Sequence, residues 1–396
     1  MDMESMDGVL MAEKSTVSLD FPEDLINRFA SRAAESDRLG EINFDNIADL
    51  HKAGYLSLTL PPDQGGRSIT LRQITTIISQ VAKGDPSTAL ILAMQYLQTI
   101  AILLSETWPD DVRNEVLDSI VTSGALLNAL RVEPELGTPA RGGIPATRIR
   151  REGDRYFLSG RKIFSTGSSA LHWGVVWGAT EEDTPRIGQI LVPLSLPGVR
   201  IEKSWHHLGM RATGSDTIIF ENVEIPEHYM INFHENGKNP ETPLLATWHT
   251  IVSPALYNAI AHSARDWLTD FLQQRVPTAL GRSLSTLPRF QTALGEIDGL
   301  LLTNEALLEL ALSKAENQTI TLAEAGQVKR LVTENAIAAV TRAVEVTGNP
   351  GLSQNNPLER HYRNVLCGRI HTPQADAVLE SAGRSAFAAS HAKSAT

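Results

Sequence analysis

The sequence predicts an α+β fold with a helical N-terminal domain, a small β domain in the middle and a helical bundle at the C-terminus. Three observations predict it: apolar residues recur at helical spacing up to about residue 123, they alternate with polar residues between glycine-bearing turns after Gly124, and long helical stripes return after residue 242. We therefore expect a flexible N-terminus at 1–19 and domains at 20–123, 124–231 and 242–392.

The first domain is expected to hold five helices. Asp20 is placed to cap the first, with Pro22 in its first turn and Glu23 closing a capping box. The fourth is apolar around most of its surface, which predicts that it is the buried centre of the domain. In chain order the helices are expected at 20–34, 44–53, 70–83, 87–104 and 110–122.

The middle domain is expected to be a small β-barrel or sandwich. Ser159-Gly160 is interpreted as a bend between two strands, and Pro226 is expected to end the domain before a polar linker at 232–242. Strands are predicted at 126–129, 147–151, 155–158, 161–165, 173–178, 188–192, 199–204 and 217–223.

Long helices joined by short loops predict a four-helix bundle in the last third of the chain. Thr321 and Glu324 have the capping-box spacing that begins the third helix, and Gly348 ends it. The other three helices are expected at 244–274, 287–315 and 374–390.

The amino-acid composition limits the kinds of partner that the protein is expected to bind. The net charge of −11 argues against nucleic acid and against an anionic membrane, because both need a basic patch. A single cysteine, Cys367, excludes an internal disulfide and a cysteine-rich metal site, and we expect no metal. There is no signal pattern and no apolar run of roughly 18 to 20 residues. We therefore expect a cytoplasmic enzyme with a small-molecule substrate.

Two motifs carry the functional signal, Val132-Glu-Pro-Glu-Leu-Gly-Thr138 and Tyr156-Phe-Leu-Ser-Gly-Arg-Lys-Ile-Phe-Ser-Thr166. They place small hydroxyls beside glycines, and hydroxyl and backbone N–H groups suit the edge of a flat polar heterocycle. Spacing alone favours an ordinary hairpin. However, the motifs resemble the flavin-cradling middle domain of the acyl-CoA dehydrogenase superfamily, and the order of the three domains agrees with that family over nearly the whole chain.

The resemblance implies that a flavin, FAD or FMN, lies against these motifs. Phe164 takes the family's aromatic position, Thr138 keeps the hydroxyl of the usual serine, and Val132 loses the hydroxyl of the usual threonine. The residues expected around the flavin ring are Val132, Gly137, Thr138, Phe164, Ser165 and Thr166.

Further cofactor residues follow from the same resemblance. Arg211 lies in a segment that resembles the end of the family's β domain; it is a candidate for holding flavin or substrate, with an ordinary surface arginine as the equal alternative. The version here, with Thr213-Gly-Ser215, is similar to the flavin-dependent monooxygenase branch. The segments around Arg275 and Gly348, which hold the adenosine diphosphate half of FAD in the family, are altered. This implies looser dinucleotide binding, or FMN instead of FAD.

The resemblance also implies that a catalytic base is missing. The family's dehydrogenases abstract the α-proton of an acyl-CoA thioester with a glutamate, and the count along the chain puts Thr372 at that position. A threonine hydroxyl is no general base near neutral pH. The second position used in the family falls near His249. His371 is therefore the first candidate catalytic residue and His249 the second, with a capping or core histidine as the structural alternative for His371.

These features favour a two-component monooxygenase of the dibenzothiophene monooxygenase-like branch, with its sulfur-acquisition relatives. In such enzymes a separate flavin reductase supplies reduced flavin, and a C4a-(hydro)peroxyflavin oxidises a sulfur, amine or aromatic substrate. The alternative is an FAD-dependent acyl-CoA dehydrogenase with a non-standard base and an electron-transfer flavoprotein as partner. A flavin-binding scaffold without catalysis is a third possibility, and the retained cradle residues argue against it. The resemblance also implies a homotetramer, a dimer of dimers.

Overall fold

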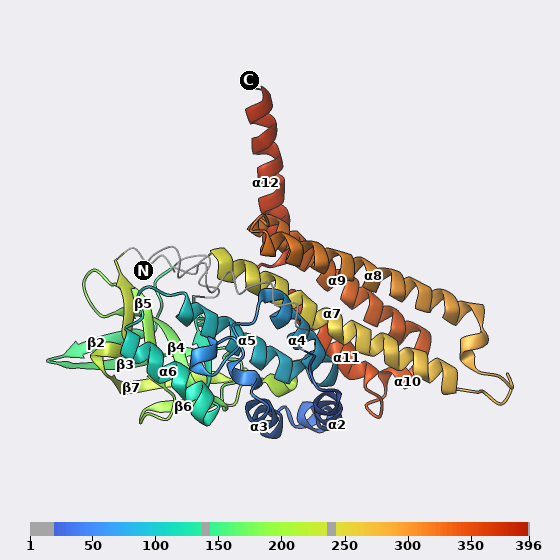
Figure 1. Cartoon of the computed structure of the whole chain (residues 1–396), viewed down its shortest axis with the longest axis horizontal. Coiled ribbons are helices and arrows are strands. Elements are labelled where there is room, and N and C mark those ends of the chain that lie inside the picture. Colours follow the sequence, from blue (N-terminus) through green and yellow to red (C-terminus); the bar gives the residue numbers. More distant parts are fainter. Residues whose placement is uncertain (1–19, 137–142, 236–242, 395–396) are drawn as a thin grey trace.

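The computed structural model describes residues 20–136, 143–235 and 243–394, and its three regions follow one another along the chain (Figure 1). A helical region, an eight-stranded sheet and a second helical region confirm the predicted α+β class. The N-terminus at 1–19 lies outside the described residues, as do Gly137, Thr138 and most of the expected linker.

The N-terminal helices begin close to their predicted starts. The predicted cap of the first was wrong: it follows Pro22 without a side-chain cap, and it continues to Leu39, where Gly40 adopts a left-handed conformation. Thr70 and Gln73 form a capping box at the start of the third. The helices are α2 (Glu23–Leu39), α3 (Phe44–Lys52), α4 (Leu71–Gly84), α5 (Pro86–Leu103) and α6 (Asp110–Ser123).

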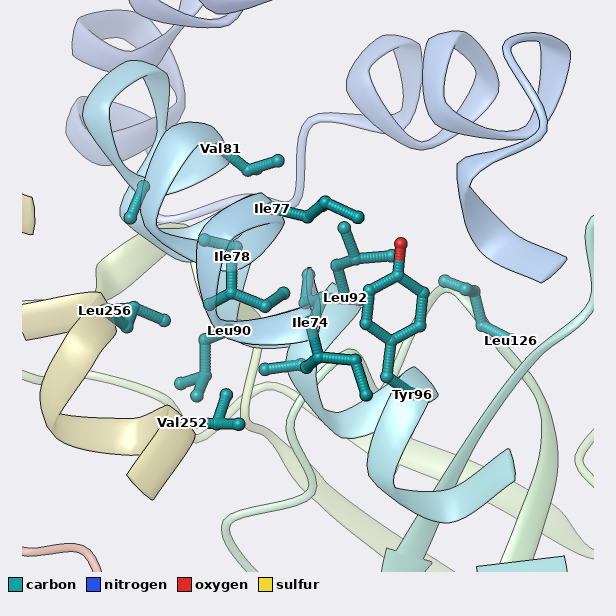
Figure 2. Close-up of a cluster of buried hydrophobic side chains, with 14 of the residues drawn as sticks. Ile74, Ile77, Ile78, Val81, Leu90, Leu92, Tyr96, Leu126, Val252 and Leu256 are labelled. Atoms are coloured by element: carbon teal, nitrogen blue, oxygen red, sulfur yellow. The ribbon is translucent and has the colours of Figure 1, made fainter. Parts of the chain in front are cut away.

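Helix α5 is the buried centre of this region, as its all-round apolar surface predicts. The Asp85 carboxylate accepts hydrogen bonds from the N–H groups of Ser87 and Thr88 and so caps its first turn. Figure 2 shows side chains of α4 and α5 packed with Val252 and Leu256 of the bundle. By length and composition alone α5 could cross a membrane, contrary to the prediction from the sequence, but 78% of it is buried inside the protein.

The middle region is one sheet in the order β6-β7-β3-β2-β4-β5-β8, and β1 pairs in parallel with β4. Most neighbouring strands are antiparallel, as the alternating sequence predicts. The strands are β1 (Leu126–Leu130), β2 (Arg148–Glu152), β3 (Arg155–Lys162), β4 (Leu171–Thr180), β5 (Ile187–Pro193), β6 (Val199–Glu202), β7 (Thr217–Ile225) and β8 (Met230–His234).

Two predicted features of the sheet were wrong. The strands expected at 155–158 and 161–165 are one strand, β3, because Gly160 is not in a bend but pairs with Phe220 of β7, and the extra residue of the adjacent bulge lies on β7. A side chain at Gly160 would come within 2.4 Å of Thr147 Oγ1, so this close approach requires glycine. Pro226 does not end the sheet, since β8 follows it and pairs with β5.

The C-terminal region is built on three long helices that pack side by side (Figure 1). The final predicted helix is present as α12, but it projects from the body and packs on α9 through Val378. The fourth member of the bundle is α11, which packs against α7 and α9. The helices are α7 (Pro243–Gln274), α8 (Pro288–Glu316), α9 (Leu322–Thr347), α10 (Asn349–Leu352), α11 (Leu358–Leu366) and α12 (Ala375–Ser394).

A buried ion pair joins the first flavin motif to the sheet. Lys162 Nζ, at the end of β3, donates to Glu133 Oε1 at 2.6 Å and to the Trp177 carbonyl, and both charged side chains are fully buried. The Glu133 carboxylate also accepts the N–H groups of Ala146 and Thr147. Burial acts to raise the pKa of Glu133, but the Lys162 ammonium and these hydrogen bonds hold it below its ordinary value.

We expect Lys162→Met to lower the free energy of unfolding by about 3–5 kcal/mol, because it leaves a buried carboxylate without its cation. Adding Glu133→Gln removes the stranded charge and keeps one oxygen to accept from one of the two N–H groups, so the double variant should recover part of the loss. Urea unfolding measures both. Lys203→Met is the control, because Lys203 forms an exposed pair with Glu41. Equal losses in the single and double variants would contradict this role of the pair.

Candidate functional site

Three of the residues predicted to face the flavin, Phe164, Ser165 and Thr166, lie in a turn at 163–168, which we call the cradle turn. Phe164 has a φ of +57°, a left-handed conformation that is rare for a bulky residue. Its ring is 53% exposed, although large apolar side chains are usually buried. Backbone strain and an uncovered ring at one position suit a surface that receives another flat group.

Backbone hydrogen bonds hold the cradle turn from both sides. On one side Val132 contributes its carbonyl, and on the other the loop between β6 and β7 contributes three. The bonds are Ile163 N–H to Val132 O at 2.9 Å, Ser165 N–H to Asp216 O at 3.2 Å, Gly167 N–H to Thr213 O at 2.9 Å and Ser168 N–H to Gly214 O at 3.1 Å.

Trp205 and His207 extend the exposed aromatic surface beside the turn. Their rings stack with centroids 3.5 Å apart, and Phe164 meets both edge-on. Burial, with His206 beside it, lowers the pKa of His207, so this ring is neutral near pH 7. The neighbours of Phe164 are therefore uncharged aromatic rings.

Three hydroxyls form a chain behind the cradle turn. Thr166 Oγ1 lies 3.0 Å from Ser215 Oγ, which lies 2.8 Å from Thr213 Oγ1. Thr213 donates to the Met210 carbonyl at 2.8 Å, and the Trp205 Nε1–H group donates to the same carbonyl at 2.9 Å. The Thr213-Gly-Ser215 segment singled out in the sequence thus reaches the cradle turn through its side chains.

The same loop also contacts the bundle. The Met210 N–H group donates to Asn364 Oδ1 of α11 at 2.7 Å. A Cβ atom at Gly209 would lie 2.1 Å from the Arg363 carbonyl, so the loop and α11 are in close backbone contact. The cradle turn is therefore tied to the helix that leads into the His371 loop.

The structure brings the two candidate histidines together. His249 and Tyr257 lie two turns apart on one stripe of α7, and both contact His371 in the loop between α11 and α12. Tyr257 Oη is 2.6 Å from His371 Nε2, and the ring centroids of His249 and His371 are 6.4 Å apart. Lys329 of α9 donates to the His371 carbonyl at 2.7 Å. We call His249, Tyr257 and His371 the histidine cluster.

Burial determines the charge state of this cluster. Burial, with His249 and Lys329 adding to it, lowers the pKa of His371 to about 3, so the imidazole is neutral at neutral pH. Burial raises the pKa of Tyr257 well above its ordinary value, and the phenol stays protonated. Burial also lowers the pKa of Lys329 to about 8. A neutral imidazole can donate one hydrogen bond and accept another. With so low a pKa, however, it is a weak base.

Carboxylates are absent from the two segments that meet here. The sequence contains no Asp or Glu at 242–265 or at 360–375. Within the described residues, no group of three His, Cys, Asp or Glu side chains is placed to hold a metal ion. The cluster therefore consists of imidazoles and a phenol.

The cradle turn fits a flavin ring. Phe164 offers an uncovered aromatic surface, and Thr166 lies beside it with its hydroxyl on the chain described above. The Ser165 hydroxyl is buried and has no hydrogen-bond partner among the described residues, which is expected where a bound group completes the site. Phe164, Ser165 and Thr166 would hold the ring of a flavin, which when bound supplies the redox chemistry.

Three other predicted cofactor residues lie elsewhere. The Arg211 guanidinium donates to the carbonyls of Asp37 and Arg38 at the C-terminus of α2, a favourable place for a cation, so it has a structural role there. Arg275 follows α7 and Gly348 ends α9, at the end of the bundle away from the sheet (Figure 1). Along α7, Arg275 is about 39 Å from His249. The structure does not bring these two residues to the cradle turn of the same chain.

The residues that position the site were not predicted from the sequence. Tyr257 had a signal, because it lies eight residues after His249 on an expected helix and so on the same face. Glu133 and Lys162 lay inside the quoted motifs, but their pairing depends on the fold. Lys329 had no signal, because a lysine on a helix is usually exposed.

Comparison with known proteins identifies the family. Residues 23–122, 131–223 and 251–390 match the N-terminal, middle and C-terminal domains of acyl-CoA dehydrogenase. The YdbM protein of Bacillus subtilis (strain 168), named provisionally as an acyl-CoA dehydrogenase, is 32% identical over 92% of this chain and 94% of its own length. The chain belongs to the acyl-CoA dehydrogenase superfamily and is a flavin-dependent oxidoreductase.

Solved structures share the fold over nearly the whole chain. Butyryl-CoA dehydrogenase from Megasphaera elsdenii has a TM-score of 0.80 and 21% identity, over 94% of this chain and all of that one. FMN-bound TdsC from Paenibacillus sp. A11-2 has a TM-score of 0.80 and 19% identity, over 90% of this chain and 94% of that one. At these identities the likeness establishes the fold, and the reaction has to be argued from the site.

We expect the His371 imidazole to stay neutral from pH 8 down to pH 5, because protonation would place an uncompensated charge in a buried site beside Lys329. NMR of protein labelled with ¹³C-histidine, with His371→Asn to assign the resonance, measures this. In urea-unfolded protein the same signal should titrate near pH 6.5. A folded-state titration between pH 6 and 7 would contradict the burial argument.

Proposed function

We propose that this protein is a flavin-dependent monooxygenase that takes reduced flavin from a separate reductase and oxidises a small sulfur, amine or aromatic compound with O2. The observation that carries the proposal is the histidine cluster. Where the family's dehydrogenases hold a glutamate base, this chain has two imidazoles and a phenol, and the segments at 242–265 and 360–375 lack carboxylates.

The proposed reaction needs no proton-abstracting base. Reduced flavin supplies two electrons and two protons to O2; one oxygen atom goes to the substrate and the other leaves as water. The cluster's part is to donate a hydrogen bond to the reacting oxygen from an uncharged group and to exclude water. When Tyr257 donates to Nε2, His371 carries its proton on Nδ1 and can offer it there.

The alternative is an acyl-CoA dehydrogenase in which a histidine replaces the glutamate. The name of the Bacillus subtilis relative and the fold shared with butyryl-CoA dehydrogenase favour it. The charge state of His371 opposes it, because a general base works best when its pKa lies near the operating pH, and burial holds that of His371 near 3. In that reading an electron-transfer flavoprotein would be the partner and FAD the cofactor.

We expect the reduced, FMN-loaded protein mixed with O2 to regain oxidised-flavin absorbance in two resolved phases, because an enclosed site delays release of hydrogen peroxide. In His371→Ala the delay should shorten by about 10- to 100-fold, the effect of losing one buried hydrogen-bonding group. Anaerobic stopped-flow absorbance measures both. His262→Ala is the control, since it removes an imidazole of α7 that faces Glu305 of α8.

The acyl-CoA dehydrogenase alternative predicts the opposite result in this reoxidation experiment. Single-phase reoxidation in the unmodified protein, together with bleaching of the oxidised flavin by an acyl-CoA, would overturn the monooxygenase proposal. The comparison of His249→Ala with His371→Ala would then identify the substitute base.

We further propose that the chain works as a homotetramer. Helix α12 projects from the body with Leu379 and Phe387 exposed, and Arg275 and Gly348 lie too far from the cradle turn to serve it within one chain. Light scattering of the 43.2 kDa chain should give a tetramer. The variant with Leu379→Ser and Phe387→Ser should give smaller species, because it removes apolar surface that a partner would bury. A stable monomer that binds flavin at one per chain would contradict this.

A further inference from the structure

We propose that Ser253 of α7 binds the substrate beside the histidine cluster, by donating a hydrogen bond to the oxygen of an uncharged hydroxyl or carbonyl group. The inference deepens the proposed function and rests on it for the assignment of the cluster as the reaction site. It narrows the sulfur, amine or aromatic compounds considered above to those that also carry such an oxygen.

Ser253 lies at the centre of the stripe of α7 that faces His371. It is four residues after His249 and four before Tyr257, so the three side chains share one face of the helix. The two outer residues are about 12 Å apart along the helix axis. The His371 ring contacts both, with its centroid 6.4 Å from that of His249 and 5.5 Å from that of Tyr257. It therefore lies opposite the level of Ser253.

The Ser253 hydroxyl is buried without a hydrogen-bond partner. The residue is 5% exposed, and its Oγ has no partner among the described residues. Other hydroxyls of the same helix are satisfied locally, since Thr247, Thr250 and Thr269 each donate to the carbonyl four residues earlier. A buried hydroxyl without a partner costs free energy, and it is expected where a bound molecule supplies that partner.

The residue after Ser253 interrupts the hydrogen bonding of the helix. Pro254 has no N–H group, so the Thr250 carbonyl lacks its usual helix donor. Within one turn of α7, a side-chain hydroxyl and a backbone carbonyl are thus both left without their usual helical partners.

The surroundings of Ser253 suit an uncharged group. Val252 and Leu256 beside it pack into the apolar cluster with Leu90 of α5 (Figure 2). Neither α5 nor residues 250–261 of α7 contain Asp, Glu, Lys, Arg or His. An ionised group would meet no counter-charge on these two elements, whereas a neutral oxygen needs only the hydroxyl proton.

The histidine cluster does not supply a charge either. The His371 imidazole is neutral, because burial lowers its pKa to about 3. The Lys329 ammonium is bound to the His371 carbonyl. The cluster and the apolar side of α7 therefore both favour a neutral substrate.

The first test measures the stability of the FMN-loaded protein without added substrate. Ser253→Ala removes the unpartnered hydroxyl and should raise the urea concentration at the unfolding midpoint. Ser263→Ala is the matched control, because it makes the same change on α7 but removes a hydroxyl that donates to the Lys83 carbonyl at 3.5 Å. Alanine favours the helix at both positions, so the difference between the variants reports on the missing partner. A midpoint of Ser253→Ala no higher than that of Ser263→Ala would contradict the inference.

The second test compares phenol and toluene, two probes of the same shape that differ in one oxygen. Changes in flavin absorbance on titration of the oxidised, FMN-loaded protein give the Kd of each. Ser253→Ala should lower the ratio of the toluene Kd to the phenol Kd by about 5- to 10-fold, the effect of losing one hydrogen bond. Ser253→Thr keeps the hydroxyl and should keep the ratio, as should Ser263→Ala. A cavity or a loosened helix weakens both probes together and leaves the ratio alone.

An unchanged ratio in Ser253→Ala would overturn the inference, and so would the failure of both probes to bind the unmodified protein. Failure of the monooxygenase proposal is a different result. Single-phase reoxidation and bleaching by an acyl-CoA report on the reaction, whereas the unfolding midpoints and the ratio of Kd values are measured without turnover.

Discussion

The arrangement of the site depends on one packing constraint, which is that α7 belongs to two cores at once. Residues 250–261 are all buried, against α4 and α5 on one side and against α8, α9 and α11 on the other. Inside the bundle, Asn258 accepts a hydrogen bond from Asn304, which also donates to the Val332 carbonyl. A helix enclosed in this way has its rotation fixed by packing on every side. The direction of the stripe that carries His249 and Tyr257 is therefore set by the apolar core.

The cradle turn depends on buried polar contacts in place of apolar packing. The Glu133–Lys162 pair fixes the first flavin motif to β3 and β4, and the loop at 210–216 holds the turn from the other side. Phe164 adopts a strained φ of +57° between these two supports. A strained backbone persists only where its surroundings over-determine it, and fully hydrogen-bonded buried networks provide that determination. The uncovered Phe164 ring and the buried Ser165 hydroxyl are the parts that these supports leave available for a ligand.

The sequence predicted the elements better than it predicted their contacts. Helix limits followed from periodicity and from caps such as Thr321 with Glu324, which are local signals. The errors occurred where a distant partner decides the outcome. Gly160 has the composition of a bend, but its pairing with β7 and its close contact with Thr147 keep it inside β3, and β8 continues the sheet after Pro226 because β5 offers an edge. Likewise, His371 could be proposed from the motif, whereas Tyr257, more than one hundred positions earlier, became its partner only through the fold.

The cradle turn and the histidine cluster are connected by a continuous series of contacts. From the cradle turn the hydroxyl chain reaches Met210, and the Met210 N–H group bonds to Asn364 of α11. Just beyond α11, a Cβ atom at Gly368 would lie 2.9 Å from Thr333 and 3.0 Å from Tyr257, so this segment is held between α9 and α7 with no room for a side chain. His371 follows three residues later, with its carbonyl bound by Lys329 and its ring by Tyr257. A ring bound at the cradle turn and the His371 imidazole would thus be positioned by one continuous set of close contacts. The proposed oxygen chemistry would depend on this arrangement, because a donor displaced by an ångström from the reacting atom loses most of its effect.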